Sequence, residues 1–285
     1  MKNRKLLIGY AIGLLIAGAV ALISQQMQPG GPRIGPGLMW WGANARPLDS
    51  FGCYPDGGSG TVNTSGTTGT WVSGTLPVST WVGKTITVNG SSYTITAVTS
   101  NTFTTSASMG THTGVAFFEK GTDNGPCIAT ALTWSIGTGG EVSCQNPRQS
   151  RGFYGVQTAQ AVHATGRYKI HGSTASCQIA WVGSASPTVA MLRIWSNLSE
   201  GPAVAQSEIS GITFSHYDTV LADLQIDQES FIKVDNLKFG AAGATPAENG
   251  LLLRAAQISQ FSNIYIEQNT AKNGVREEQL VSADP

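Results

Sequence analysis

The sequence predicts an all-β protein: a right-handed parallel β-helix, preceded by a small antiparallel β-module and by an apolar N-terminal helix. Three observations predict this fold class. Apolar residues recur about 27 residues apart in the C-terminal half, an Asn-Gly turn joins two alternating runs near residue 90, and an uncharged run follows three basic residues at the start. Stacked repeats, hairpins and export signals have these patterns.

The N-terminal 24 residues form the first element. The uncharged run Leu6–Ile23 follows basic residues and ends where polar residues return. Such a run is typical of an export signal, and Ala19-Val20-Ala21 offers small residues at cleavage spacing. The run is also nearly long enough to span a bilayer as a retained anchor. Both alternatives predict a secreted or cell-surface protein, in the periplasm or outside the cell.

The overall charge excludes one class of partner. Lys plus Arg and Asp plus Glu each number 17, so the formal net charge is zero, and charged residues make up only 12% of the chain. No basic field is present to gather phosphates, which argues against nucleic-acid binding.

Four cysteines follow the signal. In an oxidising compartment an even number permits two disulfides, with three connectivities, while free buried thiols are the alternative. Their spacing lacks the C-x-x-C pattern of a zinc site. The disulfide candidates are Cys53, Cys127, Cys144 and Cys177.

Two segments separate the signal from the C-terminal half. Residues 25–60 are rich in Gly and Pro and are expected to form a linker. Residues 61–118 contain short Thr-rich and Val-rich runs that predict strands, one of them at 81–84. Asn89-Gly90 predicts a hairpin between the strands 85–88 and 93–98. This module is similar to small Thr-rich β-modules of phage structural and bacterial surface proteins, which implies a spacer or adhesion role.

The repeat begins near residue 190. One apolar triplet recurs with identical internal spacing: Ile209, Ile212, Phe214, then Val234, Leu237, Phe239, then Phe261, Ile264, Ile266. A second pattern alternates with it: Leu192 and Ile194, then Leu224 and Ile226, then Leu251 and Leu253. Period-two apolar pairs indicate strands with one buried face.

A coil accounts for these repeats, because each strand then pairs in parallel with its equivalent one winding later. Equivalent apolar residues would stack, and the handedness of parallel crossovers favours a right-handed coil. Asn236 and Asn263 share a turn position with Gly211, where tight corners require a left-handed backbone. The repeats are expected to stop near residue 270, which leaves an edge for a tail, a partner in an oligomer, or further coils to cover.

The predicted β-helix comprises residues 119–285, and from residue 120 to about 270 it resembles the pectate-lyase-like superfamily. Thr122-Asp123, the run 128–132, and Gly139-Gly140-Glu141-Val142 resemble the aspartate turn, capping helix and first strand of its β-helices. Gly152–Val156 is similar to the family's Gly-x-Tyr-x-Val. The resemblance implies a parallel β-helix that interacts with polysaccharide. One aspartate stands where the family often has two or three.

Outward positions of the repeat supply the candidate site. Projection of the second pattern gives an exposed row of Trp195, Asp227 and Arg254, with Arg193 beside it. The triplet strand exposes Lys238 and Tyr265, with Asp235 and Glu267 nearby. Rings stack on sugars and Arg pairs with carboxylates, so Trp195, Arg193, Tyr265 and Glu267 are the candidate substrate-binding residues.

The resemblance implies two enzymatic roles and one non-catalytic role. In a lyase, Arg254 or Lys238 would be the base and Asp227 or Asp235 the stabiliser, with calcium as an optional cofactor. In a hydrolase, Asp223 with Asp227, or Asp235 with Glu267, would be the carboxylate pair. The alternative is a non-catalytic surface, adhesin or phage-tail-like protein, since outward charges are often only solvated.

Overall fold

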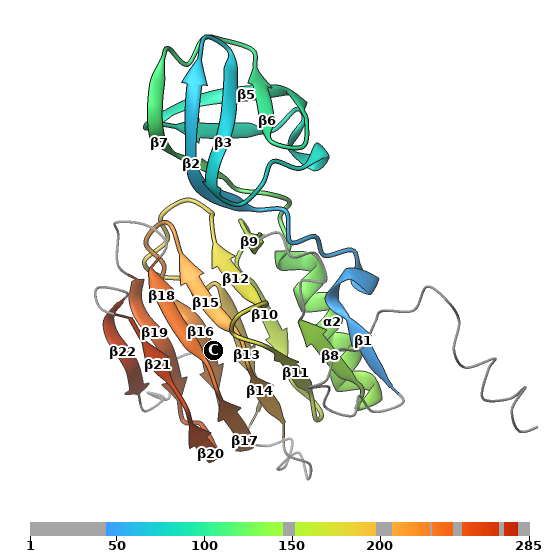
Figure 1. The fold of residues 1–285 in the computed structure, drawn as a ribbon. Coiled ribbons are helices and arrows are strands. Elements are labelled where there is room, and N and C mark those ends of the chain that lie inside the picture. Colours follow the sequence, from blue (N-terminus) through green and yellow to red (C-terminus); the bar gives the residue numbers. More distant parts are fainter. Residues whose placement is uncertain are drawn as a thin grey trace, which may run out of the picture. The chain divides into compact units, whose positions relative to one another are not determined.

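The structure is a computed structural model that describes residues 44–144, 152–197, 207–228, 230–241, 247–267 and 271–278 (Figure 1). The apolar run predicted to be a signal or anchor lies outside these residues. Within them, no helix is long and apolar enough to cross a membrane. The described chain is all-β apart from the α-helix α2 (Gly125–Thr138) and the 3-10 helices η1 (Leu48–Phe51) and η2 (Ser79–Trp81).

The first strands form a closed antiparallel barrel in the order β2-β3-β6-β5-β4-β7. These strands are β2 (Gly58–Ser65), β3 (Thr68–Gly74), β4 (Thr85–Val88), β5 (Ser91–Val98), β6 (Thr102–Thr105) and β7 (His112–Glu119). The predicted hairpin is confirmed: β4 pairs with β5, and Asn89 and Gly90 both have positive φ, as a two-residue hairpin turn requires. The strand expected at 81–84 is wrong, because Trp81 ends η2 and is buried in the barrel core.

The C-terminal half consists of three parallel sheets, named A, B and C here. Sheet A contains β1 (Ala45–Pro47), β8 (Glu141–Cys144), β11 (Lys169–Gly172), β14 (Glu208–Ser210), β17 (Ser230–Asp235) and β20 (Gln257–Ser262). Sheet B contains β9 (Tyr154–Val156), β12 (Gln178–Trp181), β15 (Thr213–His216), β18 (Lys238–Ala241) and β21 (Tyr265–Ile266). Sheet C contains β10 (Gln160–His163), β13 (Leu192–Trp195), β16 (Ala222–Asp227), β19 (Ala247–Arg254) and β22 (Ala271–Glu278).

From β8 onward the chain visits sheets A, B and C in turn, so it winds as a β-helix-like coil. The predicted stacking is confirmed by the strand registers. Val234 aligns with Ile209 and Phe261, Phe239 aligns with Phe214 and Ile266, and Leu224 aligns with Leu192 and Leu251. These columns fill one continuous core up to the fourth winding.

The corners between sheets A and B have the predicted left-handed backbone. Gly211, Asn236 and Asn263 have φ values of 66°, 50° and 54°. Only glycine and, among other residues, mainly Asn and Asp enter this region at low cost. The same turn therefore recurs at each of these three windings.

The N-terminal end of the coil is covered by α2 and by part of the segment expected as a linker. Strand β1 pairs in parallel with β8, and Leu48 of η1 is fully buried in the same core as Leu132 of α2. The structure therefore differs from the expected linker over residues 45–51. Gly and Pro break regular structure locally, but this stretch also contains apolar side chains that pack against the coil.

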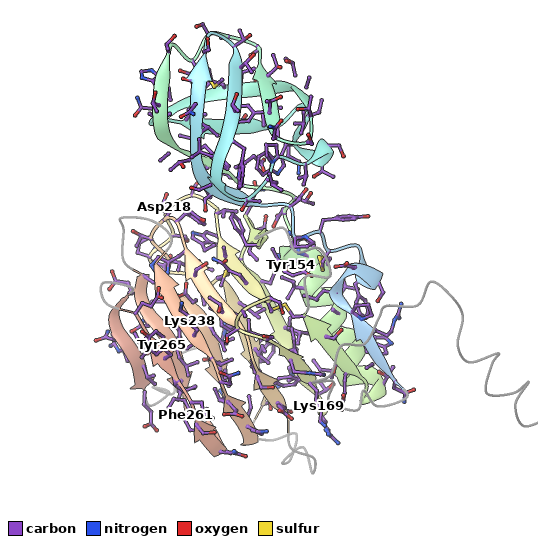
Figure 2. The ribbon with its side chains drawn as sticks, in the orientation of Figure 1. Tyr154, Lys169, Asp218, Lys238, Phe261 and Tyr265 are labelled. Atoms are coloured by element: carbon purple, nitrogen blue, oxygen red, sulfur yellow. A yellow bond between two sulfur atoms is a disulfide. The ribbon has the colours of Figure 1, made fainter. Side chains whose placement is uncertain are left out.

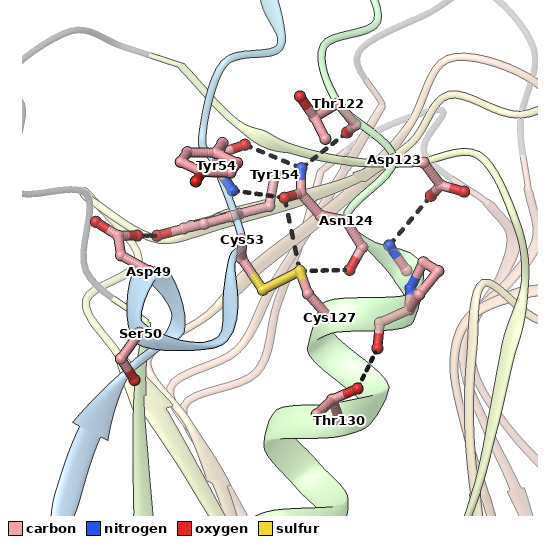
Figure 3. Close-up of a disulfide and its surroundings, with 12 residues drawn as sticks. Asp49, Ser50, Cys53, Tyr54, Thr122, Asp123, Asn124, Cys127, Thr130 and Tyr154 are labelled. Atoms are coloured by element: carbon pink, nitrogen blue, oxygen red, sulfur yellow. Dashed lines mark hydrogen bonds between the residues drawn. A yellow bond between two sulfur atoms is a disulfide. The ribbon is translucent and has the colours of Figure 1, made fainter.

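The four cysteines form two disulfides. Cys53 is bonded to Cys127, with Cα atoms 5.6 Å apart, and Cys144 to Cys177, with Cα atoms 5.4 Å apart. Figure 3 shows the first disulfide at the start of α2, where the amide of Asn124 donates to the backbone oxygen of Tyr54 and accepts from its N–H. This disulfide thus fastens the segment before the barrel to the helix after it.

The coil extends further than predicted. Strand β22 pairs in parallel with β19, with Leu251 beside Val275, so sheet C continues to residue 278. The prediction that the coil stops near residue 270 is therefore wrong, although most residues of β22 are polar and Val275 is 39% exposed. In the last winding Phe261 and Tyr265 are 46% and 61% exposed (Figure 2).

Candidate functional site

The outer face of sheet C carries two rows of chemically distinctive side chains. Leu192, Ile194, Leu224 and Ile226 point into the core, so the residues between them face outward. The strand registers align the first row as His163, Trp195, Asp227, Arg254 and Glu278, and the second as Ala161, Arg193, Gln225, Leu252 and Arg276. The predicted alignment of Trp195, Asp227 and Arg254 is confirmed.

Asp227 faces outward but is not exposed, which corrects the prediction of an exposed row. Its side chain is 1% exposed and Gln225 is 3% exposed. The carboxylate accepts hydrogen bonds from Nε of Arg193 and from Nε2 of Gln225, whose amide lies 2.9 Å from both oxygens. Burial without such donors would be costly for a carboxylate. Asp227 therefore fixes the orientation of Arg193 and Gln225.

Arg254 is held from the other side of the row. Its Nε donates to Oε2 of Glu278 at 3.0 Å, and Nη2 of Arg276 lies 2.7 Å from Oε1 of the same carboxylate. A guanidinium in such a pair remains cationic. The Glu278 carboxylate thus holds the Arg254 and Arg276 side chains next to each other.

A pocket of about 440 Å³ opens between Arg193 and Arg254. Arg193, Gln225 and Arg254 supply its polar wall. Gln160 and Thr188 also line it. Its apolar lining comes from Ala159, Ala161, Val189, Ala190 and Leu221, and the N–H of Leu221 donates to the backbone oxygen of Val189. A small apolar cluster that contains Ala190, Ala222 and Leu252 anchors the segment around Val189 to the sheet and explains why outward residues are covered here.

His163 and Trp195 extend the site along the first row. Their rings stack with centroids 4.0 Å apart and an interplanar angle of 10°. Sequence reasoning found Trp195 and placed Gln225 in the row beside it with Arg193, but it missed His163. A signal was present, because residues 163, 195 and 227 are spaced by 32 residues, the same offset that relates Leu192 to Leu224.

The carboxylate pair predicted for a hydrolase is not formed by Asp223 and Asp227. Asp223 is fully buried and accepts a hydrogen bond from Nδ1 of His216, 3.0 Å away. The backbone N–H of Ala247 donates to Nε2 of His216, so the proton of a neutral ring lies on Nδ1. His216 too is fully buried. Burial raises the pKa of Asp223, while the His216 hydrogen bond opposes this. Both ring nitrogens are occupied and the pair is structural.

The other predicted residues lie on different sheets. Asp235 ends β17 in sheet A, where Ser262 and Asn263 donate to Oδ1; the Ser262 hydrogen bond in particular lowers its pKa. Lys238 begins β18 in sheet B and pairs with Glu267, its Nζ 2.6 Å from Oε1.

Figure 2 shows Lys238 close to Tyr265 on neighbouring strands, and the Lys238 Nζ lies 5.8 Å from the Tyr265 ring centroid. Lys238, Tyr265 and Glu267 thus form a separate surface group on sheet B. Asp235 and Lys238 do not join Asp227 and Arg254, because Asp235 lies on sheet A and Lys238 on sheet B, whereas Asp227 and Arg254 lie on sheet C.

The described part of the chain contains no group of three or more His, Cys, Asp and Glu side chains that could hold a metal ion. On the outer face of sheet C, Asp227 and Glu278 are both engaged by arginine. Calcium binding to these two carboxylates would require those ion pairs to rearrange.

Comparisons with known proteins add no relative. No protein-family model matches the chain. Neither the curated proteins nor the solved structures contain a match. The function is therefore inferred from the geometry of the site.

Proposed function

We propose that this chain is an exported, polysaccharide-binding β-helix protein whose outer face on sheet C binds an acidic glycan without cleaving it. The observation that carries the proposal is the pocket between Arg193 and Arg254, on the sheet whose outer face also carries the stacked rings of His163 and Trp195. Guanidinium groups bind carboxylates with directional hydrogen bonds. Its volume of about 440 Å³ is within the usual range for small-ligand sites.

The charges of the site favour an anionic ligand of modest affinity. Asp227 neutralises Arg193 and Glu278 is shared by Arg254 and Arg276, so the three arginines exceed the two carboxylates by one positive charge. The Arg193 contact uses Nε, one of five N–H donors on the guanidinium. An acidic sugar that brings its own carboxylate supplies acceptors for this cationic wall.

Binding is favoured over cleavage by the state of the carboxylates. A glycosidase needs one carboxyl group as acid and a second as base or nucleophile. Asp223 is sealed against His216, and Asp227 is held by Arg193 and Gln225. This disfavours the hydrolase among the three roles that the resemblance implies, and we propose the non-catalytic surface, adhesin or phage-tail-like protein.

We further propose the finer architecture. The coil would be right-handed and of the pectate-lyase-like type, since crossovers between parallel strands have that hand in nearly all proteins. The run Leu6–Ile23 would export or anchor the chain, and the Thr-rich barrel would act as a spacer. The disulfides Cys53–Cys127 and Cys144–Cys177 support an oxidising compartment.

Arg254→Gln tests the site. The full chain, kept in mild detergent because of residues 6–23, is titrated with oligogalacturonate by calorimetry at low salt. Loss of one guanidinium–carboxylate contact is expected to weaken binding about tenfold, from the roughly 1.5–3 kcal/mol of a charge-assisted hydrogen bond. Arg276→Gln is the matched control, because Arg276 pairs with the same Glu278 but does not line the pocket.

The control is expected to change affinity less than twofold. Equal losses in the two variants would show that only net charge matters and would contradict the pocket. Release of unsaturated products, followed by ultraviolet absorbance, or of new reducing ends would contradict the non-catalytic part of the proposal and favour the lyase or hydrolase.

A further inference from the structure

A narrow seam closes the barrel where the chain enters and leaves it. Gly58, at the start of β2, pairs with Glu119, at the end of β7. Next to this pair, Gly121 lies so close to Gly57 that an added Cβ atom would be 2.5 Å from its backbone nitrogen. The segment that enters the barrel and the segment that leaves it therefore pack backbone against backbone.

The carboxylate of Asp56 links the entering and leaving segments by hydrogen bonds. Its oxygens accept hydrogen bonds from the backbone N–H of Thr122 at 2.7 Å, from the Thr122 hydroxyl at 2.9 Å and from Nζ of Lys84 at 2.8 Å. The indole N–H of Trp81 donates to the backbone oxygen of Asp56. Asp56, Lys84 and Thr122 thus join the entering segment, the barrel and the leaving segment.

Glu119 is the second carboxyl group of the seam, and its surroundings differ. It is 1% exposed and lies between β2 and β4, where it pairs with Gly58 and Ile86. Its Oε2 accepts a hydrogen bond from the N–H of Gly121 at 2.7 Å. A carboxylate needs several donors when it is buried, whereas a neutral carboxyl group needs fewer.

The charged groups that act on Glu119 are Lys84 and Asp56. Burial raises its pKa to about 8; Lys84 and the Gly121 N–H lower it, and Asp56 adds to the rise. The Lys84 ammonium is already paired with Asp56, 2.8 Å away, so it compensates a second negative charge only in part. Ionised Glu119 would place two carboxylates in one buried seam.

We propose that Glu119 is a pH-sensitive latch: in its neutral form it keeps the barrel seam closed, and its ionisation in mildly alkaline solution opens the seam to water. The segments that separate are residues 56–58 and 119–122. The stacked sheets do not depend on this carboxyl group and stay folded. The inference is independent of the glycan site on sheet C.

Hydrogen exchange of the full chain in mild detergent tests the latch. Peptides covering residues 56–58 and 119–122 are compared between pH 6.5 and pH 9.5, with rates corrected for intrinsic exchange. Opening linked to this one ionisation is expected to increase about tenfold per pH unit up to about pH 8, where the closed form itself ionises, and to level off above that pH. Glu119→Gln, which keeps the shape and stays neutral, is expected to abolish this dependence. Glu208→Gln, a substitution on sheet A, is the control and should retain it.

Two outcomes overturn the proposal. One is that hydrogen-exchange protection of both segments does not change with pH in the wild-type chain. The other is that Glu119→Gln shows the same pH-dependent loss of protection as the wild type. A direct titration removes reliance on the variant. Carbon-13 NMR of glutamate-labelled wild-type protein should show one carboxyl group titrating near pH 8, and titration of every glutamate near its ordinary value of about 4.5 would also overturn it.

Discussion

His216 and Asp223 show how a single buried pair connects neighbouring sheets. His216 ends β15 in sheet B, Asp223 lies in β16 of sheet C, and the ring also accepts from the backbone of β19 one winding later. One imidazole thus links three strands by hydrogen bonds at a corner of the coil. The spacing of seven residues between the two gives no indication of this in the sequence, because the contact depends on how the corner folds.

We predict that His216→Ala lowers the free energy of unfolding by about 3 kcal/mol, since it leaves the buried Asp223 carboxyl and the Ala247 N–H without their partner. Urea unfolding followed by circular dichroism measures the loss. His112→Ala, at an exposed position in the barrel, should change it by no more than about 0.5 kcal/mol. A loss below 1 kcal/mol for His216→Ala would show that the pair is not sealed.

The candidate site could be predicted only in part at this scale. Alternation and the repeat correctly placed Arg193, Asp227 and Arg254 side by side on one face. They could not predict that Asp227 is buried, because alternation gives the face on which a side chain lies and not the hydrogen bonds that Arg193 and Gln225 donate to it. Residues from different sheets, such as Asp227 and Lys238, were grouped as one site because the sequence pattern does not give the angle between faces.

At the scale of elements, the corners determine the shape of each winding. Asn236 holds its left-handed conformation between β17 and β18, and its N–H donates to the backbone oxygen of Ser262 in the next winding. A residue that disfavours the left-handed conformation at this position would displace both strands.

We therefore predict that Asn236→Ala lowers the free energy of unfolding by about 1 kcal/mol, the cost of placing a Cβ-bearing residue without a local hydrogen bond at positive φ. Asn236→Gly is the matched control and should be nearly neutral, since Gly211 occupies the equivalent corner. The same urea titration measures both. If alanine and glycine had equal effects, backbone conformation would not be the cause.

The elements with apolar repeats were predictable, and the others were not. The strands of the three late windings follow from period-two pairs that recur at 25 to 32 residues. Strand β1 was missed because Ala-Arg-Pro has no strand pattern and is held only by its pairing with β8. Strand β22 was missed because Leu251 is followed one winding later by Val275, but Leu253 by Glu277, which breaks the apolar column.

At the scale of the whole described coil, parallel registers convert residues far apart in the sequence into one surface. His163 and Glu278 are at the two ends of a single row that crosses all five strands of sheet C. Such a row suits an extended ligand, because neighbouring strands repeat about every 4.8 Å. The arginine pair gives this row its chemical selectivity.

The most direct test of the glycan proposal compares two ligands that differ in one group. Polygalacturonate oligomers and their carboxyl-reduced counterparts share chain length and linkage, and calorimetry with the wild-type full chain measures both affinities. We predict that the acidic oligomer binds at least about tenfold more tightly at low salt and that salt reduces this difference. Equal affinity for the acidic and reduced oligomers, or no binding of either, would contradict a site built to bind sugar carboxylates.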